Sequence, residues 1–119
     1  MKIGIPADEN RNDTTICMSF GRTPFFCIFN TDTREKSFLD NSAAASTGGA
    51  GIKAAQSLVN EGVEVVLTPR AGENAVDVLD AAEVKSFKTI SDDMDENIKA
   101  YEDGKLSPLK ASPGMHGHN

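Results

Sequence analysis

The chain has 119 residues, 39% hydrophobic content and a formal net charge of −6. No apolar stretch approaches the ~18 to 20 residues that a membrane span needs, so the composition predicts one soluble domain with one modest core. Lysines and arginines are scattered along the chain, which excludes the clustered positive charge of a nucleic-acid-binding protein. A small anionic ligand stays compatible with this charge, because backbone amides at a helix start can bind one.

The N-terminal stretch MKIGIPADEN turns polar after six residues and has no signal-peptide core. We therefore expect a cytoplasmic protein with reduced thiols. Two cysteines are too few for a disulfide scaffold. Cys17 falls in a polar loop and is the better candidate for a metal ligand. Cys27 shares a strand face with Phe25 and Phe29, which favours packing in the core.

The first half of the chain predicts three strands. KIGIPA (2–7) is a short apolar run, and ADENRNDTT (7–15) after it is a loop. PFFCIFN (24–30) and REKSFLD (34–40) are joined by the turn TDT, and together they predict an antiparallel hairpin.

A helix and a central strand follow a linker of small residues. GGAGIKAAQSLVNEG (48–62) has helical apolar spacing, and Gly62 supplies a stop. The expected apolar face consists of Ile52, Ala55, Leu58 and Val59. VEVVLT (63–68) is almost continuously β-branched, which is typical of a parallel strand buried on both faces.

The remaining elements alternate between helix and strand. ENAVDVLDAAE (73–83) predicts a second helix and VKSFKTI (84–90) a fifth strand. Ser91 is the expected N-cap of a third helix, which has an acidic first turn and ends at Gly104. The apolar face of the second helix is expected to contain Ala75, Val78, Leu79 and Ala82.

The predicted order βββαβαβα implies an α/β fold with a mixed sheet and right-handed crossovers. We assign residues 1–106 to one domain. The segment 107–119 is rich in Pro, Gly and Ser and predicts a flexible tail. His116 and His118 in this tail form an H-x-H run that could capture a metal, although so short a run commonly binds nothing specific.

Ligands of open α/β sheets bind outside the carboxyl ends of the parallel strands. Three loops should meet there: the end of the first strand, TGGAG before the first helix, and TPRAGENA after the central strand. The candidate anion-binding residues in these loops are Thr47, Gly48, Gly49, Gly51, Arg70, Gly72 and Asn74, with Arg22 as a second cation. Alternatively, the glycines only allow close packing, and both arginines are solvated surface residues.

Several more specific sites do not fit. GAGIKA matches a dinucleotide-binding pattern, but no acidic residue closes a downstream strand at the expected distance. The spacing of the two cysteines is not that of a zinc site or a ferredoxin. No Ser/His/Asp set or carboxylate pair assembles on the core elements, so we expect a protein that is not an enzyme.

Five ordered motifs carry a family resemblance: KIGIPAD, SFGRTPFF, GGAGIKAA, VEVVLTPRAGENA and IKAYEDGKL. They resemble the dinitrogenase iron-molybdenum cofactor biosynthesis family, which includes NifX, NifY and the C-terminal domain of NifB. This resemblance implies a ribonuclease-H-like three-layer fold with a five-stranded mixed sheet and three helices. Phe20, Gly21 and Arg22 resemble the family's Phe-Gly-Arg signature, and with Ser19 before them they would form one wall of a cofactor pocket. Relatives often carry histidine where this chain has Ser19.

The leading hypothesis is a small cytoplasmic carrier or chaperone for an iron–sulfur or molybdenum-containing cluster. The cluster would be held transiently and passed between donor and acceptor proteins. Cys17, His116 and His118 are the candidate metal ligands. The alternative is a regulatory or interaction module that binds a small anion or a partner protein without metal. The sequence leaves the particular cluster, the partner and the oligomeric state open.

Overall fold

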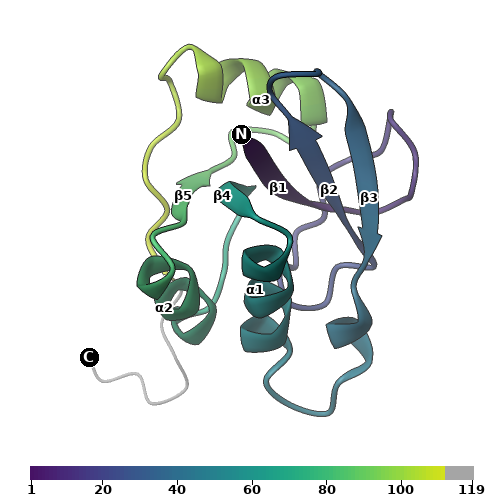
Figure 1. Cartoon of the computed structure of the whole chain (residues 1–119), viewed down its shortest axis with the longest axis vertical. Helices are drawn as coiled ribbons and strands as arrows, with labels where there is room; N and C mark the ends of the chain where they lie inside the picture. The colour runs from purple at the N-terminus through teal and green to yellow at the C-terminus, as the bar shows by residue number, and fades with distance from the viewer. Residues whose placement is uncertain (112–119) are drawn as a thin grey trace.

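The computed structural model describes residues 1–111, which form a five-stranded sheet between two layers of helices (Figure 1). In chain order the elements are β1 Lys2–Ala7, β2 Phe25–Asn30, β3 Lys36–Asp40, the 3-10 helix η1 Ser42–Ala45, α1 Ala50–Asn60, β4 Val63–Thr68, α2 Glu73–Ala81, β5 Lys85–Lys88 and α3 Met94–Glu102. None of these helices is long and apolar enough to cross a membrane.

The sheet has the strand order β3-β2-β1-β4-β5. β1, β2 and β3 pair antiparallel, whereas β4 pairs parallel with both β1 and β5. This is the arrangement of a ribonuclease-H-like α/β fold, and it confirms the predicted order βββαβαβα. The carboxyl ends of β1, β4 and β5 therefore meet at one edge of the sheet.

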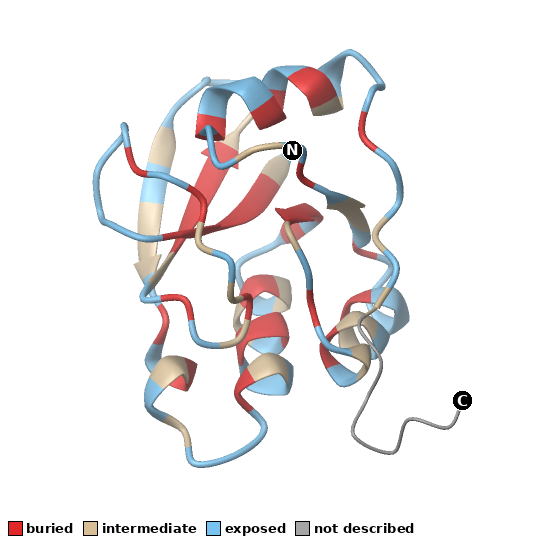
Figure 2. Ribbon diagram, turned by 180° about the vertical axis from the view of Figure 1, so that it is seen from behind, coloured by how far each residue is buried: buried red, intermediate tan, exposed pale blue. Residues whose placement is uncertain are grey.

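Helices cover both faces of the sheet, with α1 and α2 on one face and α3 on the other (Figures 1 and 2). The first face packs Phe26 of β2 with Leu58 of α1 and Leu79 of α2. On the second face, Cys27 packs in one cluster with Ile98 of α3. Because successive strand residues point to opposite faces, one strand supplies both cores. Burial of Cys27 confirms its predicted place in the core.

The hairpin turn is longer than predicted, and β3 begins at Lys36 instead of residue 34. Asn30 Oδ1 accepts hydrogen bonds from the amides of Asp32 at 2.8 Å and Thr33 at 3.2 Å. Arg34 then adopts a left-handed backbone with φ of 64°. This Asx-type turn therefore includes Arg34 and Glu35, which the sequence pattern had assigned to the strand.

Two predicted apolar helix faces are partly wrong at their ends. Ile52 is 39% exposed, because the buried face of α1 consists mainly of Ala54, Ala55 and Leu58. Ala82 is exposed because α2 ends at Ala81, so that Ala82 is only its C-cap.

The N-cap of α3 is Asp93 and not Ser91. The Asp93 side chain accepts a hydrogen bond from the Glu96 amide at 2.8 Å, which places the cap two residues later than predicted. Ser91 instead accepts from the Asp93 amide at 3.2 Å and donates to Glu96 Oε1 at 2.6 Å. The stops at Gly62 and Gly104 are confirmed, because both glycines adopt positive φ angles just after a helix.

The chain after α3 returns along the outer edge of β5. The Lys88 amide donates to the carbonyl of Ser107 at 2.9 Å, and the Leu109 amide donates to the carbonyl of Ser86 at 3.0 Å. These bonds extend the packed part of the chain beyond residue 106, where the sequence suggested a boundary. The predicted tail from residue 112 onward lies outside the described residues.

Candidate functional site

The segment around the Phe-Gly-Arg turn lies across the carboxyl end of β1. The Cys17 amide donates to the carbonyl of Pro6 at 3.0 Å, and Thr23 Oγ1 donates to the carbonyl of Ala7 at 3.0 Å. Phe20 is buried beneath the turn, with its ring edge-on to Phe26 at 5.2 Å. Phe20 therefore anchors the turn from the core side.

Arg22 ties this turn to the linker that precedes α1. Its Nη1 donates to the carbonyls of Ala44 at 3.0 Å and Ser46 at 2.9 Å. Ser19 Oγ accepts a hydrogen bond from the Arg22 amide at 3.0 Å. Ser19 and Arg22, both predicted to face a ligand, thus also fix the shape of the turn.

The start of α1 is packed between the turn and α2. A Cβ on Gly21 would lie 2.9 Å from the backbone nitrogen of Gly51, and a Cβ on Gly51 would lie 3.3 Å from the Cβ of Ala75. Both glycines therefore permit close approach, which is the packing alternative considered above. As a result, the N-termini of α1 and α2 lie side by side.

The predicted glycine loop is exposed and begins α1 without a side-chain cap. Thr47, Gly48 and Gly49 are exposed, and the N-cap Gly49 has a φ of 69° that favours glycine. The N-cap of α2 is Gly72, which also has no side chain to cap the helix. Helix α3, in contrast, is capped by Asp93. Two adjacent helix starts thus lack the side-chain acceptor that the third has.

A pocket of about 710 Å³ lies at the ends of β4 and β5, beside the loop that follows β1. Its lining residues are Ile16, Met18, Pro69, Arg70, Lys88, Thr89, Ser91, Asp92, Pro108, Leu109 and Lys110. Arg70, Lys88 and Lys110 are the basic residues among them, and Asp92 is the acidic one. We call this space the cationic pocket.

The basic side chains of the cationic pocket have no acidic partners in the described part of the chain. Within residues 1–111, Arg70, Lys88 and Lys110 form no ion pair. Met18 adds a thioether that is 61% exposed. The pocket thus combines surplus positive charge with a soft sulfur atom, which suits an anionic, polarizable ligand.

The two cysteines differ in access. Cys17 is half-buried. Its two neighbours in the chain, Ile16 and Met18, line the cationic pocket, but Cys17 itself does not. Burial raises the pKa of the Cys27 thiol to about 12, against a smaller opposing effect of Lys36. Cys27 is therefore protonated at neutral pH and poorly suited to bind a metal.

The other predicted site residues are placed unevenly. Arg70 lines the cationic pocket, and Asn74 is exposed in the first turn of α2. His116 and His118 lie outside the described residues. Within residues 1–111, no group of three His, Cys, Asp or Glu side chains is placed to hold a metal ion.

Of the residues that line the cationic pocket, sequence reasoning named only Arg70 as a site residue, and it missed Met18, Lys88 and Lys110 among the others. In this loop Cys17 is the more obvious metal ligand, and nothing in the sequence marks its neighbour Met18 as a site residue. Lys88 is at the end of a parallel strand, a position that the carboxyl-end rule marks as a candidate. Lys110 had no usable signal, because the segment around it reads as a tail rich in Pro and Ser.

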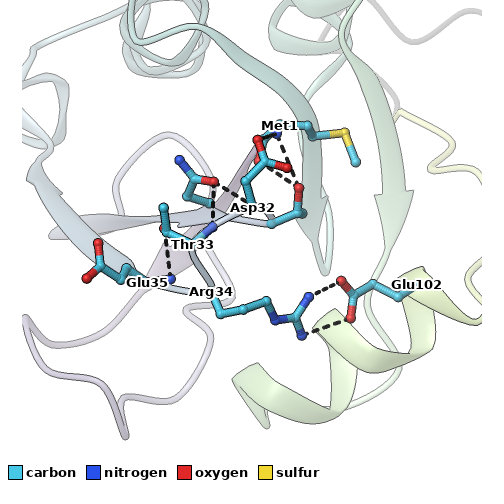
Figure 3. A network of polar contacts seen from close by, with 8 residues as sticks. Met1, Asp32, Thr33, Arg34, Glu35 and Glu102 are labelled. Carbon is cyan, nitrogen blue, oxygen red and sulfur yellow. Dashed lines mark hydrogen bonds and ion pairs between the residues drawn. The ribbon is translucent and has the colours of Figure 1, made fainter.

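A second hollow of about 1060 Å³ lies between the β2–β3 hairpin and α3, and we call it the hairpin groove. Arg34 crosses it to Glu102 with hydrogen bonds of 2.5 and 3.1 Å, as Figure 3 shows. The Arg34 guanidinium also lies 4.9 Å from the centre of the Phe29 ring. Lys36 pairs with Asp95 at 2.6 Å.

The strand order and the helices on both faces define a small ribonuclease-H-like α/β domain. The chain belongs to the family described as "Dinitrogenase iron-molybdenum cofactor", whose model matches residues 1–104. It is also 30% identical to a protein of Methanocaldococcus jannaschii that is described as uncharacterized, over 92% of each chain.

Two solved structures are similar to the whole domain. The apo form of the orange protein from Desulfovibrio gigas has 28% identity and a TM-score of 0.86, with 96% of each chain covered. A Thermotoga protein reported as a candidate NifB protein has 29% identity and a TM-score of 0.81, with 96% of this chain and 97% of that chain covered.

Proposed function

We propose that this protein is a carrier or chaperone that binds an anionic metal–sulfur cluster, containing iron or molybdenum, and passes it to a partner protein. Family membership and the likeness to a candidate NifB protein support a role in cofactor assembly. The proposal assigns no catalytic residue. The cluster is cargo, so it must be held firmly enough to be carried and loosely enough to leave.

The observation that carries the proposal is the unpaired positive charge of the cationic pocket. A chain with a net charge of −6 places Arg70, Lys88 and Lys110 around one space without giving any of them an acidic partner within residues 1–111. Keeping like charges together is unfavourable unless an anion offsets them. A sulfide-rich cluster supplies that negative charge.

The donors around this edge would hold a cluster by many weak contacts. The uncapped starts of α1 and α2 offer backbone amides, and Met18 offers a soft sulfur. Cys17 is the candidate for a covalent ligand. Few coordinate bonds and many electrostatic contacts allow the cluster to be released to a partner with stronger thiolate ligands.

Anaerobic titration of the purified protein with an iron–sulfur cluster or with tetrathiomolybdate tests the proposal. After desalting, we expect retained visible absorption and a matching metal count. Cys17→Ala should abolish uptake if a covalent bond holds the cluster, whereas Met18→Leu should do so if the thioether matters more. Cys27→Ala is the matched control, which should lower stability and leave uptake intact. A colourless native protein after both titrations would contradict the carrier function.

The same unpaired cations also suit a phosphate or a carboxylate. The alternative function is therefore a regulatory or interaction module that binds a small anion without metal. It predicts that inorganic phosphate raises the unfolding temperature of the native protein. That rise should disappear in Arg70→Gln and remain in Cys17→Ala.

A further inference from the structure

Thr89 follows the last residue of β5 and lines the cationic pocket. Its amide donates to the carbonyl of Thr68 at 3.1 Å, and the Thr68 hydroxyl donates to the carbonyl of Arg70 at 3.0 Å. Thr68 is fully buried at the end of β4, so it fixes the backbone of two pocket residues at once. Arg70 and Thr89 are therefore held in place relative to each other by one core residue.

The side chain of Thr89 carries a hydroxyl group without a partner. Thr89 is only 8% exposed, yet its Oγ1 makes no hydrogen bond within residues 1–111. The fully enclosed side-chain polar atoms that lack a partner in that part of the chain are Asn41 Oδ1 and Ser86 Oγ. The Thr89 oxygen is not one of them, so it keeps access to the pocket that Thr89 lines. A buried donor left unpaired is unfavourable, and a ligand in the pocket can accept from it.

The second hydroxyl group beside the pocket, that of Ser91, is already used. Ser91 Oγ donates to Glu96 Oε1 at 2.6 Å and accepts from the Asp93 amide at 3.2 Å. A hydroxyl has one hydrogen to donate, so Ser91 has none left for a ligand. Of these two hydroxyl groups, that of Thr89 is therefore the one available to a bound anion.

Charge and hydrogen bonding select a ligand in different ways. The lining side chains carry three positive charges, from Arg70, Lys88 and Lys110, and one negative charge, from Asp92, which leaves a surplus of two. That surplus suits a dianion, but it attracts oxygen-bearing and sulfur-bearing dianions alike. A hydroxyl donor distinguishes them, because oxygen accepts a hydrogen bond well and sulfur only weakly. A ligand without oxygen would leave the Thr89 hydroxyl unpaired.

We propose that the cationic pocket takes a dianion that keeps at least one oxo group, and that the Thr89 hydroxyl donates a hydrogen bond to that oxygen. Thr89 then selects oxo-bearing anions over fully sulfided ones. This inference rests on the proposed carrier function, because it names the chemical class of the cargo for the same pocket. For a molybdenum-containing cargo it selects a species such as dithiomolybdate, which carries both oxo and sulfido groups. The Met18 thioether, in the same pocket, is a soft contact for the sulfido groups.

The experiment measures the affinities of the native protein and of Thr89→Val for dithiomolybdate and tetrathiomolybdate by anaerobic isothermal titration. The two probes have the same charge and the same tetrahedral shape, and only dithiomolybdate contains oxygen. Because a hydrogen bond to a charged acceptor is lost, Thr89→Val should bind dithiomolybdate about tenfold more weakly. Its affinity for tetrathiomolybdate should stay within about twofold of the native value, because sulfur accepts only weakly.

Two further variants separate the hydroxyl group from the stability of the fold. Thr89→Ser keeps the donor and should restore the native affinity for dithiomolybdate. Thr14→Val is the matched control, because Thr14 is a buried threonine outside the pocket whose hydroxyl donates to the carbonyl of Thr15 at 3.0 Å. It should lower the unfolding temperature and leave both affinities unchanged.

The outcomes distinguish the role of Thr89 from the carrier function. Equal losses for both probes in Thr89→Val, or no loss for either, would overturn the role of Thr89 and leave the carrier function standing. Inorganic phosphate that binds as tightly as dithiomolybdate, with the same dependence on Thr89, would overturn a metal-containing cargo and support the anion-binding alternative. A native protein that binds dithiomolybdate in a Thr89-dependent way, yet retains no metal after desalting, would overturn the carrier function alone. A native protein that binds neither molybdenum probe would overturn both.

Discussion

The cationic pocket and the hairpin groove are comparable in size, but they differ in whether their basic side chains are paired. Both contain several basic side chains. In the hairpin groove every one has a partner: Arg34 with Glu102, Lys36 with Asp95, Lys99 with Asp103, and Lys2 with the carbonyl of Glu61. In the cationic pocket, Arg70, Lys88 and Lys110 have no acidic partner within residues 1–111.

This difference shows that the net charge of the chain is a poor guide to the local charge of a pocket. An overall charge of −6 argues against anionic ligands only on average. What matters locally is whether a basic side chain has its charge neutralised by a neighbour. In the hairpin groove the ion pairs fasten the hairpin to α3. In the cationic pocket the charge stays available to a ligand.

The largest expected effect comes from Gly21→Ala, which changes the contact between the Phe-Gly-Arg turn and the start of α1. The new Cβ would lie 2.9 Å from the backbone nitrogen of Gly51, and backbone cannot move aside cheaply. We expect a loss of about 2 kcal/mol in the free energy of unfolding, measured by urea denaturation. Gly48→Ala is the control, because nothing lies within 4 Å of its added Cβ. Equal stability of both variants would mean that α1 does not need this close contact.

The second prediction compares the loss of ligand affinity when two positive charges are removed from either hollow. Arg70→Gln/Lys88→Gln should weaken binding of tetrathiomolybdate about tenfold, which corresponds to about 1.4 kcal/mol. The matched pair Arg34→Gln/Lys36→Gln removes the same charge from the hairpin groove and should leave that affinity unchanged. Isothermal titration at two salt concentrations measures both, and the native affinity should fall as salt rises. Equal losses in both double variants would show that only net charge counts.

The sequence predicted the architecture well because its signals are periodic and local. The β-branched run of β4 and the glycine stops after α1 and α3 each reflect a backbone preference. Boundaries failed where side chains compete with the backbone: Asn30 lengthened the hairpin turn, and Asp93 replaced Ser91 as N-cap. Such competition depends on geometry that a sequence pattern does not record.

The candidate site was predictable by region and less so by residue. The rule that ligands bind at the carboxyl ends of parallel strands selects the edge where the cationic pocket lies and, with it, Arg70. It does not reveal that Gly51 is used for packing against Ala75 or that Arg22 binds the carbonyls of the linker. Lys110 reaches the pocket only because the chain returns along β5, a long-range contact without a local signal.

The third prediction concerns the two thiols: Cys17, whose neighbours line the cationic pocket, and Cys27, which is buried in the core. Burial raises the pKa of Cys27 to about 12, so iodoacetamide at pH 8 should modify Cys17 and leave Cys27 intact until the protein unfolds. In the unfolded chain Cys27 ionises near its ordinary pKa of 9.0. Stability should therefore be unaffected by this group below pH 9 and fall above it, by roughly 1.4 kcal/mol per pH unit up to the folded pKa.

Mass spectrometry locates the alkylated cysteine, and urea denaturation from pH 8 to 10.5 measures the slope. Cys27→Ala is the control, because it removes the ionising group and should reduce the alkaline loss of stability. Rapid alkylation of Cys27 in the folded protein would contradict its buried, neutral state.

The smallest expected effect is that of Glu102→Gln, which removes the acidic partner of Arg34 in the hairpin groove. The hydrogen bond from Arg34 lowers the pKa of Glu102, so its ionised form contributes stability at neutral pH that is lost as pH falls through that pKa. Both side chains are exposed to solvent and screened by salt. We therefore expect the unfolding temperature at pH 7 to drop by no more than about 2 °C.

The difference between native protein and Glu102→Gln should shrink at high salt, and it should also shrink as the pH falls through the lowered pKa of Glu102. Calorimetry at these conditions measures it, with Asp103→Asn as a neighbouring acidic control outside the Arg34 pair. A large shift at pH 7 that persists at high salt would mean that the hairpin groove is held together by this pair. In that case the Arg34–Glu102 pair would hold the hairpin against α3. The two hollows would then differ in role, because the charges of the hairpin groove would be structural and those of the cationic pocket would serve a ligand.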